Sequence, residues 1–412
     1  MIGFISELIY RLIYPLLLVF HKHGGYSDEA IKLKKGFVSF DKENKKVIMF
    51  HGVSVGEVNA IEKLVKKSKE VFNNAKIVVT TGTNTGQEVA KKKLGNIVDL
   101  VTYFPFDTPS CVKRFLDNIQ PDIIMVAETE IWPNIAVECK KRGIKLCIIN
   151  GRISDRTYKS YKMLKFFFKP LLNNYAGIYT QSSEDLDKFL SLGTNPETTK
   201  RMNNLKFDIT APEVNFKFDK SGRVLLCAST HSGEDEICIN VYKKLKEKYN
   251  DLKLIIAPRH LTRIDEVEAV VGESGFTYEF RSKDVKSMSD IDIMILDTMG
   301  ELSKMFAYSD ISFIGGSFNK TGGHNPLESI IFSKPVISGP SIHNFKDIYA
   351  IIQNANAGFV VKSGEEFFNA ADKLLADNSY YKEVSKNGDD VFKAQQGALE
   401  YVINVIKSEL IM

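Results

Sequence analysis

The chain has 412 residues, of which 44% are hydrophobic and 26% are charged. This length and balance predict a globular protein of two or three domains, with enough apolar residues to form real cores. The net charge of +4 is too small to indicate a nucleic-acid-binding protein. The 5 cysteines are an odd number and form no CxxC pair, which argues against a disulfide framework and against a zinc site.

The N-terminal segment MIGFISELIYRLIYPLLLVF is strongly apolar. Its uncharged run, residues 12–20, is too short to span a bilayer alone, and no signal-peptide cleavage site follows it. Basic residues come next, among them Lys32, Lys34 and Lys35, and residues 1–50 hold 8 Lys and Arg against 5 Asp and Glu. Because such a segment suits the anionic cytoplasmic leaflet, we expect a membrane-associated helix that lies in the interface. The alternative is a helix buried against its own domain.

From residue 46 onward, short apolar runs alternate with amphipathic helical segments. This alternation is typical of a parallel sheet with helices on both faces. In the first half we expect strands at residues 46–50, 76–81, 122–127, 145–150 and 177–182. In the second half we expect strands at residues 223–229, 253–258, 292–297, 310–316 and 335–339.

Residues 203–222 separate the two halves, since they contain Pro, Asn, Asp and Gly and lack periodicity. The predicted fold is α/β, with two Rossmann-like parallel-sheet domains facing a cleft, as in the GT-B glycosyltransferases. This is a fold analogy, because doubly wound sheets host many functions. The expected parts are a membrane-associated helix at 1–22, a first domain at 23–208, a linker at 209–222, a second domain at 223–395, and a C-terminal helix at 396–412 that packs back on the first domain.

Polar motifs follow the expected strands of the first half, where a ligand of such a sheet binds. The first motif, HGVSVGE, ends at Glu57, and the spacing of Ser54 and Glu57 is that of a helix capping box. The same carboxylate at the mouth of a cleft suits a general base that takes a proton from a sugar hydroxyl. Both interpretations stay open at this point.

Two further motifs follow strands of the first half. The turn GTNTG, with Thr83, opens a helix and suits a phosphate or a sugar, although an ordinary polar turn has the same composition. The motif ETEIWPN places Glu128 and Glu130 at a strand end before the only Trp. These acids either favour the positive end of the next helix or form part of a site.

The second half places Arg259 and several Gly-, Ser- and His-rich turns after its strands. Arginine and helix N-termini suit a phosphate, and a carboxylate such as Glu328 suits the two hydroxyls of a ribose. This half therefore reads as the nucleotide-binding half. His51, His231, His260 and His324 lack metal-ligand spacing, and the Asp290–Ile291–Asp292 triplet, which has the form of a DxD metal motif, leads into an expected strand, so we expect no metal site.

Taken together, the chain resembles the Kdo transferases of lipopolysaccharide synthesis, where Kdo is 3-deoxy-D-manno-octulosonic acid. The resemblance runs in the family's order, from the apolar N-terminus to about residue 396. It is carried by HGVSVGE, TTGTNTG, PFDTP, RFLDNIQPDIIMVAETEIWPN, NGRIS, NLKFD, STHSGEDE, PRH, DTMGEL, GGSFNKTGGHNPLE and GPSIHNFKD. GGHNPLE and ETEIWPN are its most specific segments.

The resemblance implies an inverting GT-B enzyme at the cytoplasmic face of the inner membrane, without metal or cofactor. It implies transfer of Kdo from CMP-Kdo to lipid IVA, with Glu57 as the base and with Glu128 and Lys206 as transition-state support. On the acceptor side we place Ser54, Gly56, Thr83 and Arg152. The implied CMP-binding residues are Ser229, Thr230, Pro258, Arg259, Met299, Gly300, Glu301, Asn325, Pro326, Leu327 and Glu328. The implied partners are CMP-Kdo, lipid IVA and inner-membrane lipids, with no nucleic acid.

Asn203 departs from the family, which has Gly before NLKFD, but Asn tolerates the left-handed backbone better than most residues. Gly151 replaces a common Ala. Two alternatives remain: another GT-B sugar-nucleotide enzyme, such as an epimerase or a different transferase, and a non-catalytic scaffold. The scaffold would be favoured by loss of Glu57, Glu128 or Lys206, and all three are present.

Overall fold

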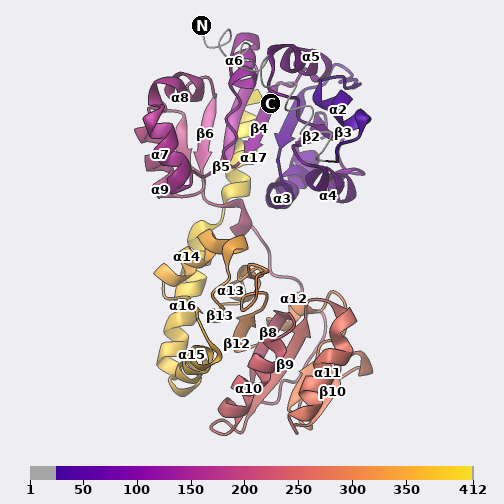
Figure 1. Cartoon of the computed structure of the whole chain (residues 1–412), viewed down its shortest axis with the longest axis vertical. Helices are drawn as coiled ribbons and strands as arrows, with labels where there is room; N and C mark the ends of the chain where they lie inside the picture. The colour runs from indigo at the N-terminus through magenta and orange to yellow at the C-terminus, as the bar shows by residue number, and fades with distance from the viewer. Residues whose placement is uncertain (1–24, 411–412) are drawn as a thin grey trace. The chain divides into compact units, whose positions relative to one another are not determined.

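The computed structural model describes residues 25–410, which form two compact units. The first unit contains residues up to Asp208 and the segment from Gln396, and the second contains Ile209–Gln395 (Figure 1). The expected N-terminal helix at 1–22 lies outside the described residues. Within residues 25–410, every helix falls short of the length and apolar character that a membrane span requires.

The first unit is built on a seven-stranded parallel sheet in the order β3-β2-β1-β4-β5-β6-β7. β1 lies in the interior of this sheet, between β2 and β4, and Ile48 pairs with Ile77 on one side and with Ile123 on the other. The strands are β1 (Val47–His51), β2 (Lys76–Thr81), β3 (Leu100–Tyr103), β4 (Ile123–Ala127), β5 (Lys145–Gly151), β6 (Gly177–Thr180) and β7 (Thr199–Arg201).

Helices cover both faces of this sheet because alternate strand residues point to opposite sides. Ile48 and Phe50 belong to one buried cluster, and Val47 and Met49 belong to the other. The C-terminal helix α17 packs against α3 and β4, inside the first unit. The helical segments are α2 (Asp28–Lys34), α3 (Val55–Val71), α4 (Asn84–Leu94), α5 (Pro109–Ile119), α6 (Pro133–Arg142), α7 (Asp155–Met163), α8 (Lys165–Leu172), α9 (Ser183–Ser191), η1 (Leu205–Phe207) and α17 (Ala398–Leu410).

The second unit repeats the architecture with a seven-stranded parallel sheet in the order β10-β11-β9-β8-β12-β13-β14. Its strands are β8 (Arg223–Thr230), β9 (Leu252–Pro258), β10 (Tyr278–Phe280), β11 (Ile293–Ile295), β12 (Ile311–Ile314), β13 (Val336–Ser338) and β14 (Gly358–Val360). Its helical segments are α10 (Glu234–Lys246), η2 (Leu261–Arg263), α11 (Ile264–Glu273), η3 (Arg281–Lys283), α12 (Leu302–Met305), α13 (Leu327–Ile330), η4 (His343–Phe345), α14 (Lys346–Asn354), α15 (Gly364–Ala376) and α16 (Asn378–Gln395).

The strand order reverses once in each sheet, between β1 and β4 in the first unit and between β8 and β12 in the second. In open parallel sheets, ligands bind beyond the carboxyl ends of the strands at such a reversal. The motif that contains Glu57 follows β1, and the motif that contains Glu128 follows β4. In the second unit, the turns after β8 and β12 occupy the equivalent place.

Candidate functional site

Glu57 lies in the first turn of α3, and Ser54 caps this helix as the spacing predicted, although Glu57 accepts from the N–H of Val53 and not from that of Ser54. Its Oε2 accepts a hydrogen bond from the Val53 backbone N–H at 2.7 Å, and its Oε1 accepts one from the Ser54 hydroxyl at 2.9 Å. The Ser54 hydroxyl in turn caps the Glu57 backbone N–H. The carboxylate is therefore held in place just beyond the carboxyl-terminal end of β1, and each of its oxygens keeps a second lone pair that can receive a proton.

Glu128 directly follows β4, and Arg152 follows β5. Arg152 donates from Nε to the Glu128 carboxylate at 3.0 Å, and its backbone N–H donates to the Thr129 hydroxyl at 3.1 Å. The Glu128 backbone has φ of 58°, a left-handed conformation that is uncommon outside glycine. Such a conformation at a strand end motivates a functional interpretation of Glu128.

Electrostatic coupling joins three carboxylates at this edge of the first sheet. Burial raises the pKa of Glu57, the neighbouring Glu128 charge raises it further, and Arg152 and the two hydrogen bonds lower it. Burial, with Glu57 and Glu128 nearby, raises the pKa of Glu130 to about 7. Arg152 offsets the charges of Glu128 and Glu57, whereas Glu130 is affected by burial and by both carboxylates, so the site favours keeping a proton on one of the three acids. The sequence placed Glu130 at this strand end but gave it no role.

Lys206 lies on η1, within a segment that several hydrogen bonds fix to the first unit. The Asn204 side chain accepts from the Lys206 backbone N–H at 3.0 Å, and the Asn150 side chain accepts from the Leu205 N–H at 3.0 Å. Asn203 has φ of 71°, which confirms the left-handed backbone expected where the family has Gly. Since η1 packs against α3, the structure places Lys206 in the same layer as the helix whose first turn contains Glu57.

The turn after β2 serves first to cap α4. The Thr83 hydroxyl accepts a hydrogen bond from the Gly86 N–H and donates to the Val53 carbonyl, each at 3.1 Å. The Val53 carbonyl also accepts from the Gly82 and Thr83 backbone N–H groups. Thr83 therefore links the loop after β2 to the loop that carries Glu57. Gly56 is exposed in the first turn of α3, where a Cβ would meet only the Ser54 hydroxyl, at 3.8 Å.

Lys34 requires a correction, because the sequence grouped it with basic residues that face a membrane. Its side chain is buried, and its ammonium donates to the Gly82 carbonyl at 2.7 Å. The ammonium also lies over the rings of Tyr26 and Tyr103, at 4.7 and 5.2 Å from their centroids. Burial lowers the pKa of Lys34 to about 8. The lysine supports the turn after β2 and is not available to a lipid surface.

In the second unit, a buried carboxylate organises the turns after β8 and β12. Glu234 accepts hydrogen bonds from the backbone N–H groups of His231, Gly316, Ser317 and Phe318 at 2.6–2.9 Å. Ser229, near the end of β8, has a left-handed backbone with φ of 56°, and the β8–β9 pairing shifts register between Ala228 and Thr230. Glu234 thus shapes the loops of the predicted donor site without any need to touch the donor.

Arg259, Glu328 and His324 lie together at this edge of the second sheet. Arg259 follows Pro258, the buried last residue of β9, and its side chain is exposed. Burial raises the pKa of Glu328, and the Arg259 charge lowers it. Burial, with His231 and Arg259 nearby, lowers the pKa of His324 to about 4. His324 and His231 are joined by an Nε2–Nε2 hydrogen bond of 2.9 Å, so one neutral ring donates and the other accepts.

The remaining predicted donor residues lie on two short turns. The Asn325 side chain accepts from the Leu327 backbone N–H at 3.1 Å, which shapes the turn into α13, and Pro326 and Leu327 are buried. Met299 is 83% exposed, and Gly300 has φ of 79°. Glu301 forms an ion pair with Arg281 at 2.9 Å and accepts from the Thr298 hydroxyl. No local pattern indicated a role for Arg281, because it lies 20 residues before its partner Glu301.

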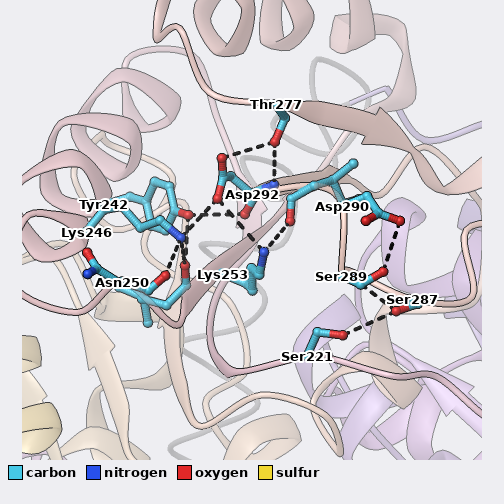
Figure 2. A network of polar contacts seen from close by, with 12 residues as sticks. Ser221, Tyr242, Lys246, Asn250, Lys253, Thr277, Ser287, Ser289, Asp290 and Asp292 are labelled. Atoms are coloured by element: carbon cyan, nitrogen blue, oxygen red, sulfur yellow. Dashed lines mark hydrogen bonds and ion pairs between the residues drawn. The ribbon is translucent and has the colours of Figure 1, made fainter.

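Other charged groups serve the fold. Arg263 donates to Asp235, Glu266 and the Thr230 carbonyl, so its guanidinium is already engaged. Asp292 lies at the opposite, amino-terminal edge of the second sheet, where it pairs with Lys246 at 2.9 Å and accepts from the Thr277 hydroxyl at 3.0 Å. Figure 2 shows this network, in which Asp290 points toward Ser289. Among residues 25–410, no group of three or more His, Cys, Asp or Glu side chains could hold a metal ion.

The two parallel α/β units define the class of protein. A putative UDP-N-acetylglucosamine 2-epimerase from Listeria monocytogenes has a similar fold, with a TM-score of 0.56 over 89% of this chain and 97% of that chain. Its sequence is 14% identical, so the likeness concerns the fold alone. The family model of group 1 glycosyl transferases matches residues 235–391, in the second unit. Two such units in one chain are the architecture of the GT-B enzymes.

The sequence comparisons then identify the family. The model of the 3-deoxy-D-manno-octulosonic-acid transferase (kdotransferase) matches residues 29–209. A 3-deoxy-D-manno-octulosonic acid transferase from Haemophilus influenzae is 32% identical over 88% of this chain and 87% of its own length. One from Rickettsia bellii is 30% identical over 97% and 94%. The chain therefore belongs to the Kdo transferase family and is a glycosyltransferase.

Another relative is a bifunctional glycosyltransferase/methyltransferase from Fusobacterium nucleatum. It is 36% identical over 90% of this chain, and the chain spans 58% of its length.

Proposed function

We propose that this protein transfers Kdo from CMP-Kdo to the lipid A precursor lipid IVA, with inversion at the anomeric carbon, at the cytoplasmic face of the inner membrane. The first unit binds the acceptor, and the second binds the donor. Relatives named as Kdo transferases match both units, which supports the substrate class. The observation that carries the mechanism is the fixed Glu57 carboxylate, with its raised pKa, at the sheet edge where strand order reverses.

On the acceptor side, Glu57 acts as the general base. A glucosamine hydroxyl of the acceptor attacks the anomeric carbon of Kdo, and its proton passes to the free lone pair of a Glu57 oxygen. The raised pKa makes the carboxylate a stronger base than an exposed Glu. The Ser54 and Val53 hydrogen bonds hold it in one orientation, so little reorganisation is needed during the reaction.

Charge balance on the donor follows from Arg259, Lys206 and the Glu128–Arg152 pair. The bond from Kdo to the CMP phosphate breaks as the new glycosidic bond forms, and the electron pair leaves with the phosphate. Arg259 offsets the phosphate charge, and Lys206 offsets the Kdo carboxylate or the leaving group. Glu128, oriented by Arg152, stabilises the positive charge that develops at the anomeric centre. Glu328 accepts hydrogen bonds from the ribose hydroxyls, and Asn325 shapes the turn that carries Glu328.

A product assay tests this function. Purified protein is incubated with CMP-Kdo and tetraacylated lipid A precursor in the presence of EDTA, and products are read by mass spectrometry. We expect a lipid product heavier by one or more Kdo residues and an equal amount of CMP. UDP-N-acetylglucosamine as the only sugar nucleotide should give no product and no epimer. Absence of Kdo transfer, or conversion of the UDP-sugar, would overturn the proposal in favour of another GT-B activity.

A further inference from the structure

Helices α7 and α8 lie on the flank of the first sheet, beside β6 (Figure 1). Large apolar side chains are exposed on them. Of the five large hydrophobic side chains that are exposed in residues 25–410, three lie here: Met163 at 76%, Leu164 at 40% and Phe166 at 80%. They occupy the end of α7 and the start of α8, within four consecutive positions. Clustered exposure of this kind marks an interaction surface, whereas single exposed apolar residues are ordinary.

The fold does not use these three side chains. The inner faces of the two helices pack through Tyr158, Tyr161 and Phe168 against the core of the first unit, and the Tyr161 and Phe168 rings lie 4.0 Å apart. α7 has no buried residue along its nine positions. The segment therefore has an aromatic side that faces the protein and an apolar side that faces outward.

Basic side chains surround the apolar side. Residues 155–172 contain five Lys and Arg and one Asp, and that Asp pairs with Lys188 at 2.8 Å. Arg156, Lys159 and Lys162 of α7 are all exposed. Long cationic side chains around a small apolar patch complement a surface that is apolar below and anionic above, as at the headgroup level of a lipid bilayer.

We propose that the α7–α8 surface, made of Arg156, Lys159, Lys162, Met163, Leu164 and Phe166, docks on a bilayer that contains anionic lipid. The three apolar side chains enter the interface, and the cations lie at the headgroups. This contact is separate from the apolar N-terminal segment. α7 begins three residues after Arg152, which pairs with Glu128, so docking here brings the lipid surface next to the proposed acceptor site. Only that last consequence rests on the proposed function.

A site-specific probe in the full chain separates this contact from any other. All five native cysteines are buried, so a cysteine introduced at exposed Ser160 can be labelled selectively with an environment-sensitive fluorophore. Ser160 lies one turn from Met163 and leaves the apolar side chains intact. Lys92→Cys, exposed on α4 of the same unit, provides the matched control. Vesicles are phosphatidylcholine alone or with phosphatidylglycerol, and brominated lipids report depth.

We expect a blue shift and bromolipid quenching at position 160 with the anionic vesicles, and neither at position 92. Adding Met163→Ser and Phe166→Ser should weaken the response at position 160 about tenfold, whereas Met163→Leu with Phe166→Leu should restore it. Replacing Lys159 and Lys162 by Gln should weaken the response and reduce its salt dependence, since Arg156 remains. Three results would each overturn the proposal. They are equal signals at positions 160 and 92, an unchanged response after the Ser substitutions, and Ser substitutions that reduce self-association of the protein but leave vesicle binding unchanged. None of these readouts depends on transfer activity.

Discussion

The Nε of Arg152 donates a hydrogen bond of 3.0 Å to the carboxylate of Glu128, across the ends of two adjacent parallel strands. Both members of this pair also act on Glu57, in opposite directions: the Glu128 charge raises its pKa, and the Arg152 charge lowers it. The pair is thus both an oriented charge and a control on the proposed base. Because the Arg152 side chain is 45% exposed, the pair adds at most about 1 kcal/mol to stability.

The pH dependence of transfer tests this control. The acid limb of the kcat/KM profile reports the pKa of the base in the free enzyme. Glu128→Gln removes a negative neighbour and should move that limb to lower pH, and Arg152→Gln removes a positive neighbour and should move it to higher pH. Both variants should also be slower than wild type. Shifts in the same direction, or none, would show that the limb does not belong to Glu57.

Glu130 should make the protein less stable as pH rises. Its pKa is raised in the folded protein from 4.5 to about 7, so the folded state binds the proton more tightly than the unfolded state does. The contribution of this bound proton to the free energy of unfolding is fully present below pH 4.5 and is lost as pH rises through about 7. Glu130→Gln should therefore stabilise the protein by about 2 kcal/mol at pH 8 and change little at pH 4. Urea unfolding at the two pH values measures this, and an equal effect at both would contradict it.

Glu234 should be essential for the stability of the second unit. Glu234→Ala leaves four backbone N–H groups without their acceptor, and we expect a loss of about 3 kcal/mol or more in the free energy of unfolding. Glu236→Ala, at an exposed position in the same first turn of α10, should change it by less than about 0.5 kcal/mol. Chemical denaturation followed by circular dichroism provides the measurement. Similar values for the two variants would exclude the organising role of Glu234.

Arg259 should contribute to CMP binding through charge. Arg259→Ala is expected to weaken CMP binding, measured by calorimetry, about tenfold or more, because a charge-assisted bond to phosphate is lost. Its backbone N–H bond to the Thr230 carbonyl remains, so the turn should stay folded. Lys244→Ala, at an exposed position on α10, is the matched control and should bind CMP as wild type does. Cytidine, which lacks the phosphate, should bind both variants equally; a tenfold loss for cytidine as well would point to a disturbed site.

The sequence predicted ten of the fourteen strands within residues 25–410, and the four it missed share one property. β3, β7, β10 and β14 are the edge strands of the two sheets. Each has three or four residues and is only partly buried. A central strand of a parallel sheet is buried on both faces and reads as a continuous apolar run, whereas a short edge strand carries no such run.

The site was predictable where a strand end and a local motif coincide. Glu57 and Glu128 follow apolar runs, and the Ser54–Glu57 spacing gave the cap. Contacts between residues far apart in the chain could not be predicted from the sequence. They are Arg281 with Glu301, Glu234 with the turn after β12, and buried Lys34 with the turn after β2. These contacts depend on tertiary packing, which places residues 20 to 84 positions apart within hydrogen-bond distance.

The most direct test of the proposed mechanism is the rate of Kdo transfer to lipid IVA by Glu57→Gln at saturating CMP-Kdo. Gln keeps the size of the side chain and one acceptor oxygen, but it cannot take the proton. We expect a fall of about 100-fold or more in kcat, with CMP affinity and melting temperature close to wild type. A Glu57→Gln enzyme that transfers Kdo at the wild-type rate would contradict the assignment of Glu57 as the base.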